Sequence, residues 1–412
     1  MSLDRLLHYV SLDGAGGVEQ QFVEFVRAAR GMSHARHAVV ACGQRIHPLI
    51  EQRLDQQAPV VFEKYAGGFK LPKWPRQIRL HRQRHIVART RPDAVVIWNR
   101  LRDSLDTLAA AGAERCIYWE RGASWFAGDS RAKRDFLAAV PAVICNSHAA
   151  KRMLELRWGY AGQIRVIHNA LRPSLLPATP PKPRQLRDSH TLTLGVVARL
   201  ESIKGVAVAL HALAQLGTHG HDMQLRIAGD GPERLRLELL AQQLDIADRV
   251  VFEGLVADMP AFYSRIDLLV HPALREPFGQ IAVEAGAYGV PVVVTAVDGL
   301  VEVVEHGRTG LCIEPTLSVA EYAALGADEA GLPPFVYDPS KDTIDAPRAL
   351  DPQMLCQTIM DICNDEPGYA RMSEAGLQAA TQRFAFDEHV RKALAAIESF
   401  VQTGLLAPAS SS

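Results

Sequence analysis

Several features are scarce in this chain of 412 residues. It has only six cysteines. They stand at positions 42, 116, 145, 312, 356 and 363, without the spacing of paired metal ligands, so neither a zinc site nor disulfides are predicted. Several lie in apolar runs such as PAVICNS, which is typical of buried thiols in a reducing compartment. Neither sign of charge is in excess, with 45 Lys+Arg against 46 Asp+Glu, so nucleic acid is not an expected partner.

A long apolar run is missing from the start of the chain. The opening MSLDRLLHYVSLDGAGG carries an acidic residue and only a short apolar stretch, too little for a signal peptide or a membrane helix. We therefore expect a cytoplasmic protein. The composition, with 48% hydrophobic residues, is that of a globular protein. The length predicts two domains of roughly 150 to 200 residues each.

Short β-rich runs alternate with helical patterns along most of the sequence. The first half contains HAVVAC, DAVVIWN, RCIYW, AVICNS and IRVIHN, and the second contains TLTLGVVARL, QLRIAGDG, RVVFEGL, IDLLVHP, VPVVVT and GLCIEP. This alternation is typical of βαβ units with parallel sheets covered on both faces. We predict an α/β protein of two doubly wound domains that face a cleft, with the ligand beyond the carboxyl ends of the strands.

Breaks in this pattern predict the domain boundaries. The stretch RPSLLPATPPKPRQLRDSH is rich in proline and has little periodicity, which is typical of a linker. We predict an N-terminal domain over 1–171, a linker over 172–190 and a C-terminal domain over 191–383. Residues 316–348 are long for a connection and are predicted to be an insertion with short elements of its own. An amphipathic helix over 386–401 lies in a final segment, 384–404, before a frayed tail over 405–412.

The stretch VVARLESIKG places two cations just after a predicted strand. Arg199 and Lys204 there suit a diphosphate, the arginine as a fork and the lysine as a point charge. An Arg and a Lys near a helix start are also common on solvated surfaces. The following IAGDGPERLRLELL has ordinary strand-to-helix turn chemistry, and a tight connection without ligand contact explains it equally.

The stretch REPFGQIAVEAGAYGVPVV places Glu276 and Glu284 around the start of a predicted helix, Gly279 to Tyr288. Free N–H groups at Gly279, Gln280 and Ile281 would favour an anion at this helix start. Two carboxylates beside an anion site suit a ligand with phosphates in the middle and hydroxyls at both ends. A nucleotide sugar has this layout.

Together these motifs resemble family 4 glycosyltransferases in order and spacing. Members are similar in being retaining enzymes with the GT-B architecture of two Rossmann-like domains. The resemblance is strongest over 190–315 and includes VVFEGLV. In the N-terminal half, DGAGGVEQQFVEF looks like the family's first glycine loop, where Gly16 and Gly17 would approach the donor phosphates. NSHAAKRML, VIHNALRP and RFAFDEHV are similar to later segments, the last being where the final helix crosses back onto the N-terminal domain.

The resemblance implies a role for each matching residue in binding the donor. Arg199 and Lys204 would hold the leaving diphosphate, and Glu284 would hold the ribose hydroxyls. Glu276 and the backbone of Phe278, Gly279, Gln280 and Ile281 would hold the donor sugar. The nucleobase would lie beside Phe252 to Leu255, which includes Gly254. The resemblance implies no metal and no cofactor; the sequence has no Asp-x-Asp motif, and two protein cations would neutralise the leaving group.

The resemblance also implies a mechanism without a protein nucleophile, in which the departing phosphate helps to take the acceptor's proton. Many members place a His or Asp after the strand that corresponds to RCIYW. This chain has Glu120 and Arg121 there. Glu120 is therefore a candidate catalytic residue, and a capping or ion-pair role for these two residues is the alternative.

A basic stretch without acids runs from Lys64 to Arg91, interleaved with Tyr65, Phe69 and Trp74. It could contact an anionic membrane surface at the inner membrane or hold an anionic acceptor. The alternative is a solvated amphipathic helix.

These features predict a metal-independent, retaining glycosyltransferase that moves a hexose-type sugar from a nucleotide donor to a glycan or glycolipid acceptor, in lipopolysaccharide or surface polysaccharide synthesis. A nucleotide-sugar epimerase or hydrolase of the same fold is one alternative. A nucleotide-binding subunit without catalysis is another. A dinucleotide dehydrogenase is disfavoured, because the first glycine loop lacks the expected third glycine and no acidic ribose reader is evident.

Overall fold

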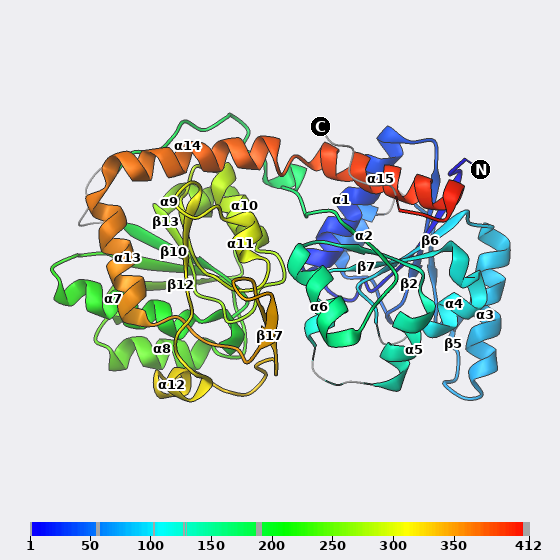
Figure 1. The fold of residues 1–412 in the computed structure, drawn as a ribbon, viewed down its shortest axis with the longest axis horizontal. Helices are drawn as coiled ribbons and strands as arrows, with labels where there is room; N and C mark the ends of the chain where they lie inside the picture. Colours follow the sequence, from blue (N-terminus) through cyan, green and yellow to red (C-terminus); the bar gives the residue numbers. More distant parts are fainter. Residues whose placement is uncertain are drawn as a thin grey trace. The chain divides into compact units, whose positions relative to one another are not determined.

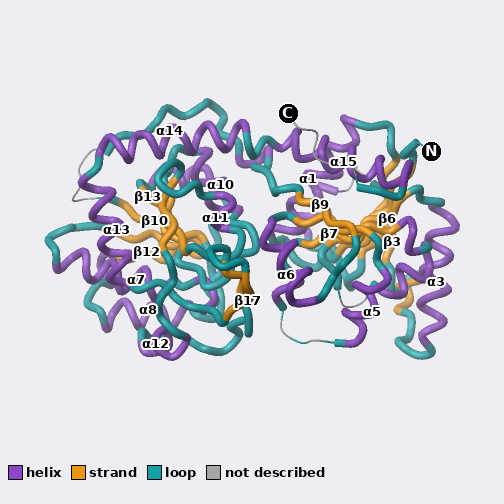
Figure 2. The backbone as a smooth tube through the Cα atoms, in the orientation of Figure 1, coloured by secondary structure: helices purple, strands orange, loops and turns teal. Residues whose placement is uncertain are grey.

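The computed structural model describes residues 2–54, 58–101, 104–126, 128, 130–186 and 192–406. They form two compact units. The described residues up to His168 and from Phe386 onward make the first unit, and residues 169 to 385 make the second. Each unit is built around its own parallel sheet (Figures 1 and 2).

The first unit has a seven-stranded sheet in the order β3-β2-β1-β6-β7-β8-β9, and all neighbouring strands are parallel. The strands are β1 (Arg5–Val10), β2 (Arg36–Ala41), β3 (Val60–Phe62), β6 (Ala94–Trp98), β7 (Cys116–Glu120), β8 (Ala142–Cys145) and β9 (Gln163–Val166). The five strands predicted for this half are present, and β1 and β3 are additional. Strand order reverses between β1 and β6, which is where a doubly wound sheet opens a crevice for ligands.

Helices connect and cover these strands. They are α1 (Gly17–Met32), α2 (Pro48–Leu54), α3 (Arg76–Thr90), α4 (Leu105–Ala111), α5 (Arg131–Ala139) and α6 (His148–Trp158). A small antiparallel hairpin of β4 (Tyr65–Ala66) and β5 (Phe69–Lys70) precedes α3. The last helix, α15 (Phe386–Thr403), belongs to this unit although it is distant in sequence, and it packs against α1.

The second unit has a six-stranded parallel sheet in the order β12-β11-β10-β13-β14-β15. Its strands are β10 (Thr193–Val197), β11 (Gln224–Ala228), β12 (Val250–Gly254), β13 (Leu268–His271), β14 (Val292–Thr295) and β15 (Gly310–Ile313). All six match runs that the sequence predicted. This is the strand order of a Rossmann sheet, and its switch point lies between β10 and β13.

Both faces of the second sheet are buried under helices. Leu268 and Val270 pack with the core beneath α7, α8 and α13, whereas Leu269 packs with the core beneath α9, α10 and α14. These apolar side chains alternate because successive residues of a strand point to opposite faces. The helices are α7 (Val206–Thr218), α8 (Arg234–Gln243), α9 (Met259–Arg265), α10 (Gln280–Ala287), α11 (Leu300–Val303), α13 (Pro352–Asn364) and α14 (Glu366–Gln382).

The predicted insertion at 316–348 contains three short elements. Helix α12 (Val319–Ala324) begins with a capping box between Ser318 and Glu321. A hairpin of β16 (Val336–Asp338) and β17 (Thr343–Asp345) follows. Backbone hydrogen bonds between Leu317 and Ala349 join the two ends of the segment, so it closes on itself as a compact elaboration.

The proline-rich stretch at 172–190 is attached to the second unit. Its described part, to residue 186, contains a short turn at Pro173–Leu175. The guanidinium of Arg184 donates to the backbone oxygens of Tyr288 at 2.9 Å and Tyr263 at 2.8 Å. Residues 187–190 of the predicted linker lie outside the described residues, as do 407–412 of the predicted tail. Leu406 still donates its N–H to the Gln163 side chain at 2.9 Å.

Candidate functional site

The switch point of the second sheet brings together two loops that are far apart in sequence. Lys204 ends the turn Ser202–Lys204 after β10, and Gly205 follows with φ of +69°. A methyl group on Gly205 would lie 1.9 Å from the carbonyl oxygen of Pro272, so only glycine permits this approach. The N–H of Leu274 also donates to the carbonyl of Ile203 at 2.9 Å. The loop after β13 is thereby held against the turn that carries Lys204.

This contact places Lys204 beside Glu276. The Lys204 Nζ lies 2.8 Å from Glu276 Oε2, and the two side chains are 19% and 17% exposed. Burial alone would raise the pKa of the Glu276 carboxyl, but the charge of Lys204 and the hydrogen bond from His271 hold that pKa well below its ordinary value. The site therefore carries a fixed anion beside a fixed cation, which can accept from sugar hydroxyls and pair with a phosphate.

His271, the last residue of β13, completes this cluster. Its Nε2 lies 3.2 Å from the same Glu276 oxygen. Burial lowers the pKa of His271, and Glu276 opposes that shift in part. Sequence reasoning did not single out this histidine. Its position at the carboxyl end of IDLLVHP, directly before the Glu276 loop, was the available signal.

Asp298 fixes the backbone at Glu276. Its Oδ2 accepts from the N–H of Glu276 at 2.9 Å, and its Oδ1 accepts from the N–H of Tyr337 at 2.7 Å. The N–H of Asp298 donates back to the carbonyl of Tyr337 at 3.0 Å. Asp298 is fully buried with φ of +47°, so one side chain connects the site to hairpin β16-β17. Asp298 is not among the predicted site residues; the Asp-Gly pair after VPVVVT was the available signal.

The start of α10 lies next along the chain from Glu276. Gly279 is its N-cap with φ of +101°, and a methyl group there would lie 2.7 Å from Leu300 Cδ2. The Phe278 side chain is buried and packs edge-on against Phe384. Phe278 can therefore offer a ligand only its backbone, and it directly precedes the start of α10, the end of a helix that favours an anion.

Glu284 lies within α10 and is only 4% exposed. Its Oε1 is 3.0 Å from Arg172 Nη2, and its Oε2 accepts from the hydroxyl of Tyr263 at 3.0 Å. Both carboxylate oxygens thus have protein partners. Its role as ribose ligand stays a prediction, and a bound ribose would share these oxygens with Arg172 and Tyr263.

Three other predicted donor residues lie on or beside strands of the same sheet. Arg199 follows β10 directly, but its side chain is 71% exposed and pairs with Glu201 at 3.1 Å. No contact within the described part of the chain joins its guanidinium to Lys204 or Glu276. At the end of β12, the carbonyl of Gly254 accepts from the N–H of Gly229 at 2.7 Å, and Leu255 beside it is 85% exposed. The roles of all three stay predictions.

In the first unit, Gly16 is the N-cap of α1 and Gly17 is its first residue. This helix start follows β1, at the switch point of the first sheet. Gly16 has an ordinary φ of −75°, so a left-handed backbone is not the reason for glycine there. The proposed approach to donor phosphates stays a prediction.

Glu120 is enclosed by its own turn. Its Oε1 accepts from the N–H groups of Gly122 at 2.7 Å and Ser124 at 3.0 Å, and its Oε2 accepts from the Tyr118 hydroxyl at 2.6 Å. Burial raises the pKa of Glu120, although these hydrogen bonds oppose the shift. The geometry assigns Glu120 a clear structural role in the turn after β7, and a catalytic role stays a prediction.

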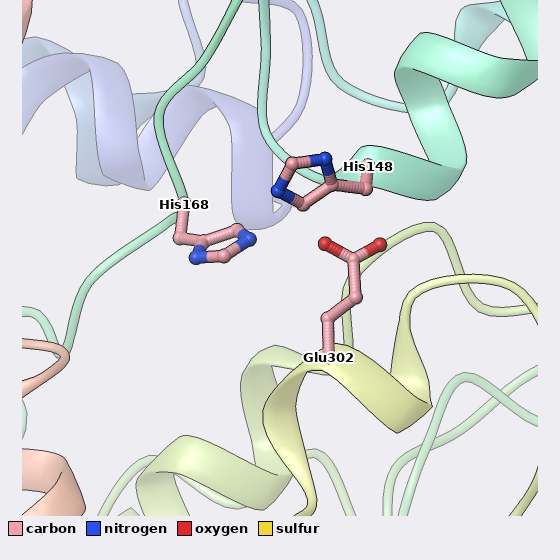
Figure 3. A group of neighbouring side chains, drawn as sticks. All are labelled: His148, His168 and Glu302. Atoms are coloured by element: carbon pink, nitrogen blue, oxygen red, sulfur yellow. The ribbon is translucent and has the colours of Figure 1, made fainter. Parts of the chain in front are cut away.

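Figure 3 draws three residues of the kinds that bind metals, His148, His168 and Glu302. The two imidazoles belong to the first unit, with ring centroids 5.7 Å apart. Glu302, from α11, belongs to the second unit, so the three residues do not define a metal site.

Comparisons with known proteins show the family of this chain. The sequence pattern described as "Glycosyl transferases group 1" matches residues 181–327, and the pattern described as "Glycosyltransferase Family 4" matches residues 15–175. The chain belongs to glycosyltransferase family 4 and has the GT-B fold. Between them, the two patterns cover most of both units of this family 4 chain.

Individual relatives support the same family. An uncharacterized glycosyltransferase of Methanocaldococcus jannaschii is 39% identical over 121 residues, which is 29% of this chain and 31% of that protein. The first three relatives are each matched over only 31% to 43% of their own length. The lipopolysaccharide core biosynthesis glycosyltransferase LpsE of Rhizobium meliloti is 25% identical over 302 residues, covering 73% of this chain and 81% of LpsE.

The fold of this family 4 chain is shared with solved structures. Anabaena HepE, crystallised with UDP and glucose, superposes with a TM-score of 0.68 at 20% identity, over 95% of this chain and 98% of HepE. Within the described ranges, no helix combines the length and the apolar character needed to cross a membrane.

Proposed function

We propose that this protein transfers a hexose-type sugar, with retention of configuration, from a nucleoside-diphosphate sugar to a glycan or glycolipid acceptor. The observation that carries this proposal is the cluster of Lys204, Glu276 and His271 at the switch point between β10 and β13, beside the start of α10. It offers one cation for a diphosphate, one carboxylate for sugar hydroxyls and N–H donors for an anion.

In this mechanism the second unit holds the donor. Lys204 stabilises the negative charge that grows on the leaving diphosphate, and Arg199 would join it by turning away from Glu201. Glu276 accepts from hydroxyls of the sugar, and its negative charge stands beside the positive charge that develops on the sugar as the glycosidic bond breaks. The reaction then needs no metal and no cofactor. UDP in the HepE crystals makes UDP-sugars the first donors to test.

The matches to LpsE and to a second Rhizobium meliloti core enzyme, LpsD, favour lipopolysaccharide or surface polysaccharide synthesis as the process. The acceptor would then be a growing glycan, free or lipid-linked. We also propose peripheral contact with the cytoplasmic face of a membrane through the basic segment Lys64–Arg91. Phe69 and Trp74 there are 81% and 83% exposed, beside Lys70 and Lys73.

The test is incubation of the full chain with UDP-, GDP-, ADP- and dTDP-sugars, with and without a lipopolysaccharide core acceptor, while nucleotide release and glycan mass are measured. Transfer predicts acceptor-dependent release with a mass gain of one hexose, and anomeric analysis of the product reports retention. Nucleotide release without an added sugar would favour a hydrolase, and epimerised donor would favour an epimerase. Donor binding without turnover would favour a non-catalytic subunit. EDTA leaves transfer unchanged if no metal takes part.

A further inference from the structure

Arg121 is a buried cation at the carboxyl end of β7. The residue is only 7% exposed, and its guanidinium carbon lies 4.9 Å from the ring centroids of both Trp98 and Trp119. Its Nε and Nη2 are buried and have no hydrogen-bond partner among the described residues. The neighbouring Glu120 does not supply one, because its oxygens accept from Tyr118 and from its own turn.

An unpaired buried charge costs several kcal/mol even after relaxation, whereas a desolvated cation–π contact returns about 2 kcal/mol. Burial is the cause that lowers the pKa of Arg121, to about 9, and no carboxylate of the described residues opposes it. Arg121 still remains charged at neutral pH. The nearby His389 supplies no negative charge, because an imidazole is either neutral or cationic. Burial and the charge of Arg121 lower its pKa to about 3, so it is neutral at pH 7. The described part of the fold therefore holds a cation at Arg121 without a counter-charge.

The side chains around Arg121 indicate what kind of group would pair with its guanidinium. The Trp119 Nε1 is also buried without a partner in the described part of the chain. The His389 ring lies 5.8 Å from the Trp119 ring, and its Nε2 is also buried without a partner in the described residues; this atom is a neutral acceptor while Nδ1 donates to the His168 carbonyl. The unpartnered atoms of Arg121 and Trp119 are N–H donors, and the charge of Arg121 favours an acceptor with negative charge as their partner. The position of Arg121 favours a ligand over a structural partner as the missing group. Arg121 follows the carboxyl end of β7, and doubly wound sheets bind their ligands beyond the carboxyl ends of the parallel strands.

We propose that Arg121 binds an oxyanion, a carboxylate or a phosphate, carried by the acceptor, so that the preferred acceptor is an anionic glycan. That this ligand is the acceptor of the reaction rests on the proposed transferase function. The binding of an oxyanion to Arg121 does not rest on that function, and it can be measured without turnover. Arg121 is thus a specificity residue in the first unit, whereas the donor residues lie in the second.

The experiment is thermal unfolding of the full chain, alone and with glucuronic acid, glucose 6-phosphate, glucose or UDP. Glucuronic acid or glucose 6-phosphate should raise the Tm of the wild type, and glucose should not. Arg121→Met should abolish that rise. Without ligand, the same variant should unfold at a higher temperature than the wild type, by about 2 °C or more, because it removes the unpaired charge. Arg36→Met, an exposed arginine in the same unit, is the matched control and should change neither result.

Three results would overturn the proposal. A lower Tm for Arg121→Met without ligand would make Arg121 a structural residue. Equal stabilisation by glucose and glucuronic acid would show that the protein does not recognise an oxyanion. A rise that UDP alone produces, and that Arg121→Met abolishes, would assign Arg121 to the donor instead of the acceptor. Failure of the transferase assay alone, with anion binding intact, would count against the proposed function and leave the oxyanion site in place.

Discussion

The N–H of Glu276 donates to Asp298 Oδ2 at 2.9 Å, while the other Asp298 oxygen accepts from Tyr337 of hairpin β16-β17. Asp298→Asn replaces one of these acceptors with an NH2 group that faces an N–H donor. A hydrogen bond to a charged group contributes about 1.5–3 kcal/mol, so we expect transfer to fall roughly 10-fold or more and the protein to be less stable. Steady-state transfer assays and thermal unfolding measure the two effects.

Asp245→Asn is the control for Asp298→Asn. Asp245 also has a positive φ, of +54°, but it is exposed and far from this site in sequence. Asn tolerates this backbone region as Asp does, so the control should keep wild-type activity and stability. Full transfer by Asp298→Asn would show that Glu276 does not need this hydrogen bond.

The pair of Lys204 and Glu276 gives the second prediction. Lys204→Ala and Glu276→Ala should each reduce transfer by at least about 100-fold, the scale of losing one preorganised charge contact. Lys151→Ala breaks an ion pair with Glu155 in α6, which is more exposed, and it should leave transfer unchanged. Near wild-type transfer by both site variants would show that Lys204 and Glu276 take no part in the reaction.

Arg199→Ala tests a residue that the structure leaves paired with Glu201. We expect this variant to lose about as much transfer activity as Lys204→Ala, because the Arg199 guanidinium would turn to the diphosphate when the donor binds. Unchanged kcat and KM would remove Arg199 from the donor site and leave Lys204 as the cation there.

Gly279 gives a prediction about how the site is built. Gly279→Ala adds a methyl group 2.7 Å from Leu300 Cδ2 at a residue with φ of +101°. Strain of this kind costs about 1–3 kcal/mol, so both Tm and transfer should fall. Gly67→Ala separates the two causes, because Gly67 also has a positive φ but has nothing within 4 Å of an added methyl group. Equal losses in both variants would mean that the contact with Leu300 contributes nothing.

The sequence predicted the alternation of strands and helices well, because apolar runs such as VPVVVT form strands that are buried on both faces and leave a strong local signal. It also placed Lys204, Glu276 and Gly279 at the ends of strands or at the start of a helix. It missed His271 and Asp298, whose importance comes from contacts across loops. It could not show that Glu284 meets Arg172 and Tyr263, or that Glu120 closes its own turn, since these pairings depend on packing and not on local pattern.

The basic segment Lys64–Arg91 gives a prediction about membranes. Lys70→Glu with Lys73→Glu reverses two charges beside the exposed Phe69 and Trp74, and each basic residue near an anionic surface contributes about 1 kcal/mol. The affinity for phosphatidylglycerol vesicles, measured by sedimentation, should therefore fall at least 10-fold relative to the wild type. Arg27→Glu with Arg131→Glu reverses two charges elsewhere on the first unit, at side chains that are 62% and 94% exposed, and should bind as the wild type does. Equal vesicle binding by all three proteins would exclude this segment as the contact.

The buried His389 predicts how stability depends on pH. Burial and the charge of Arg121 lower its pKa from 6.5 to about 3, so between these values the unfolded chain binds a proton that the folded chain does not. Stability from this group is therefore present above pH 6.5 and is lost as the pH falls toward 3, with a slope of about 1.4 kcal/mol per pH unit. His389→Phe should have a shallower decline of unfolding free energy over this range, even if its stability at pH 7 is lower because the contact with the His168 carbonyl is lost. His219→Gln, at an exposed position, should keep the wild-type slope. If His389→Phe shows the same slope as the wild type in urea unfolding from pH 7 to pH 4, the histidine is not held neutral in the folded protein.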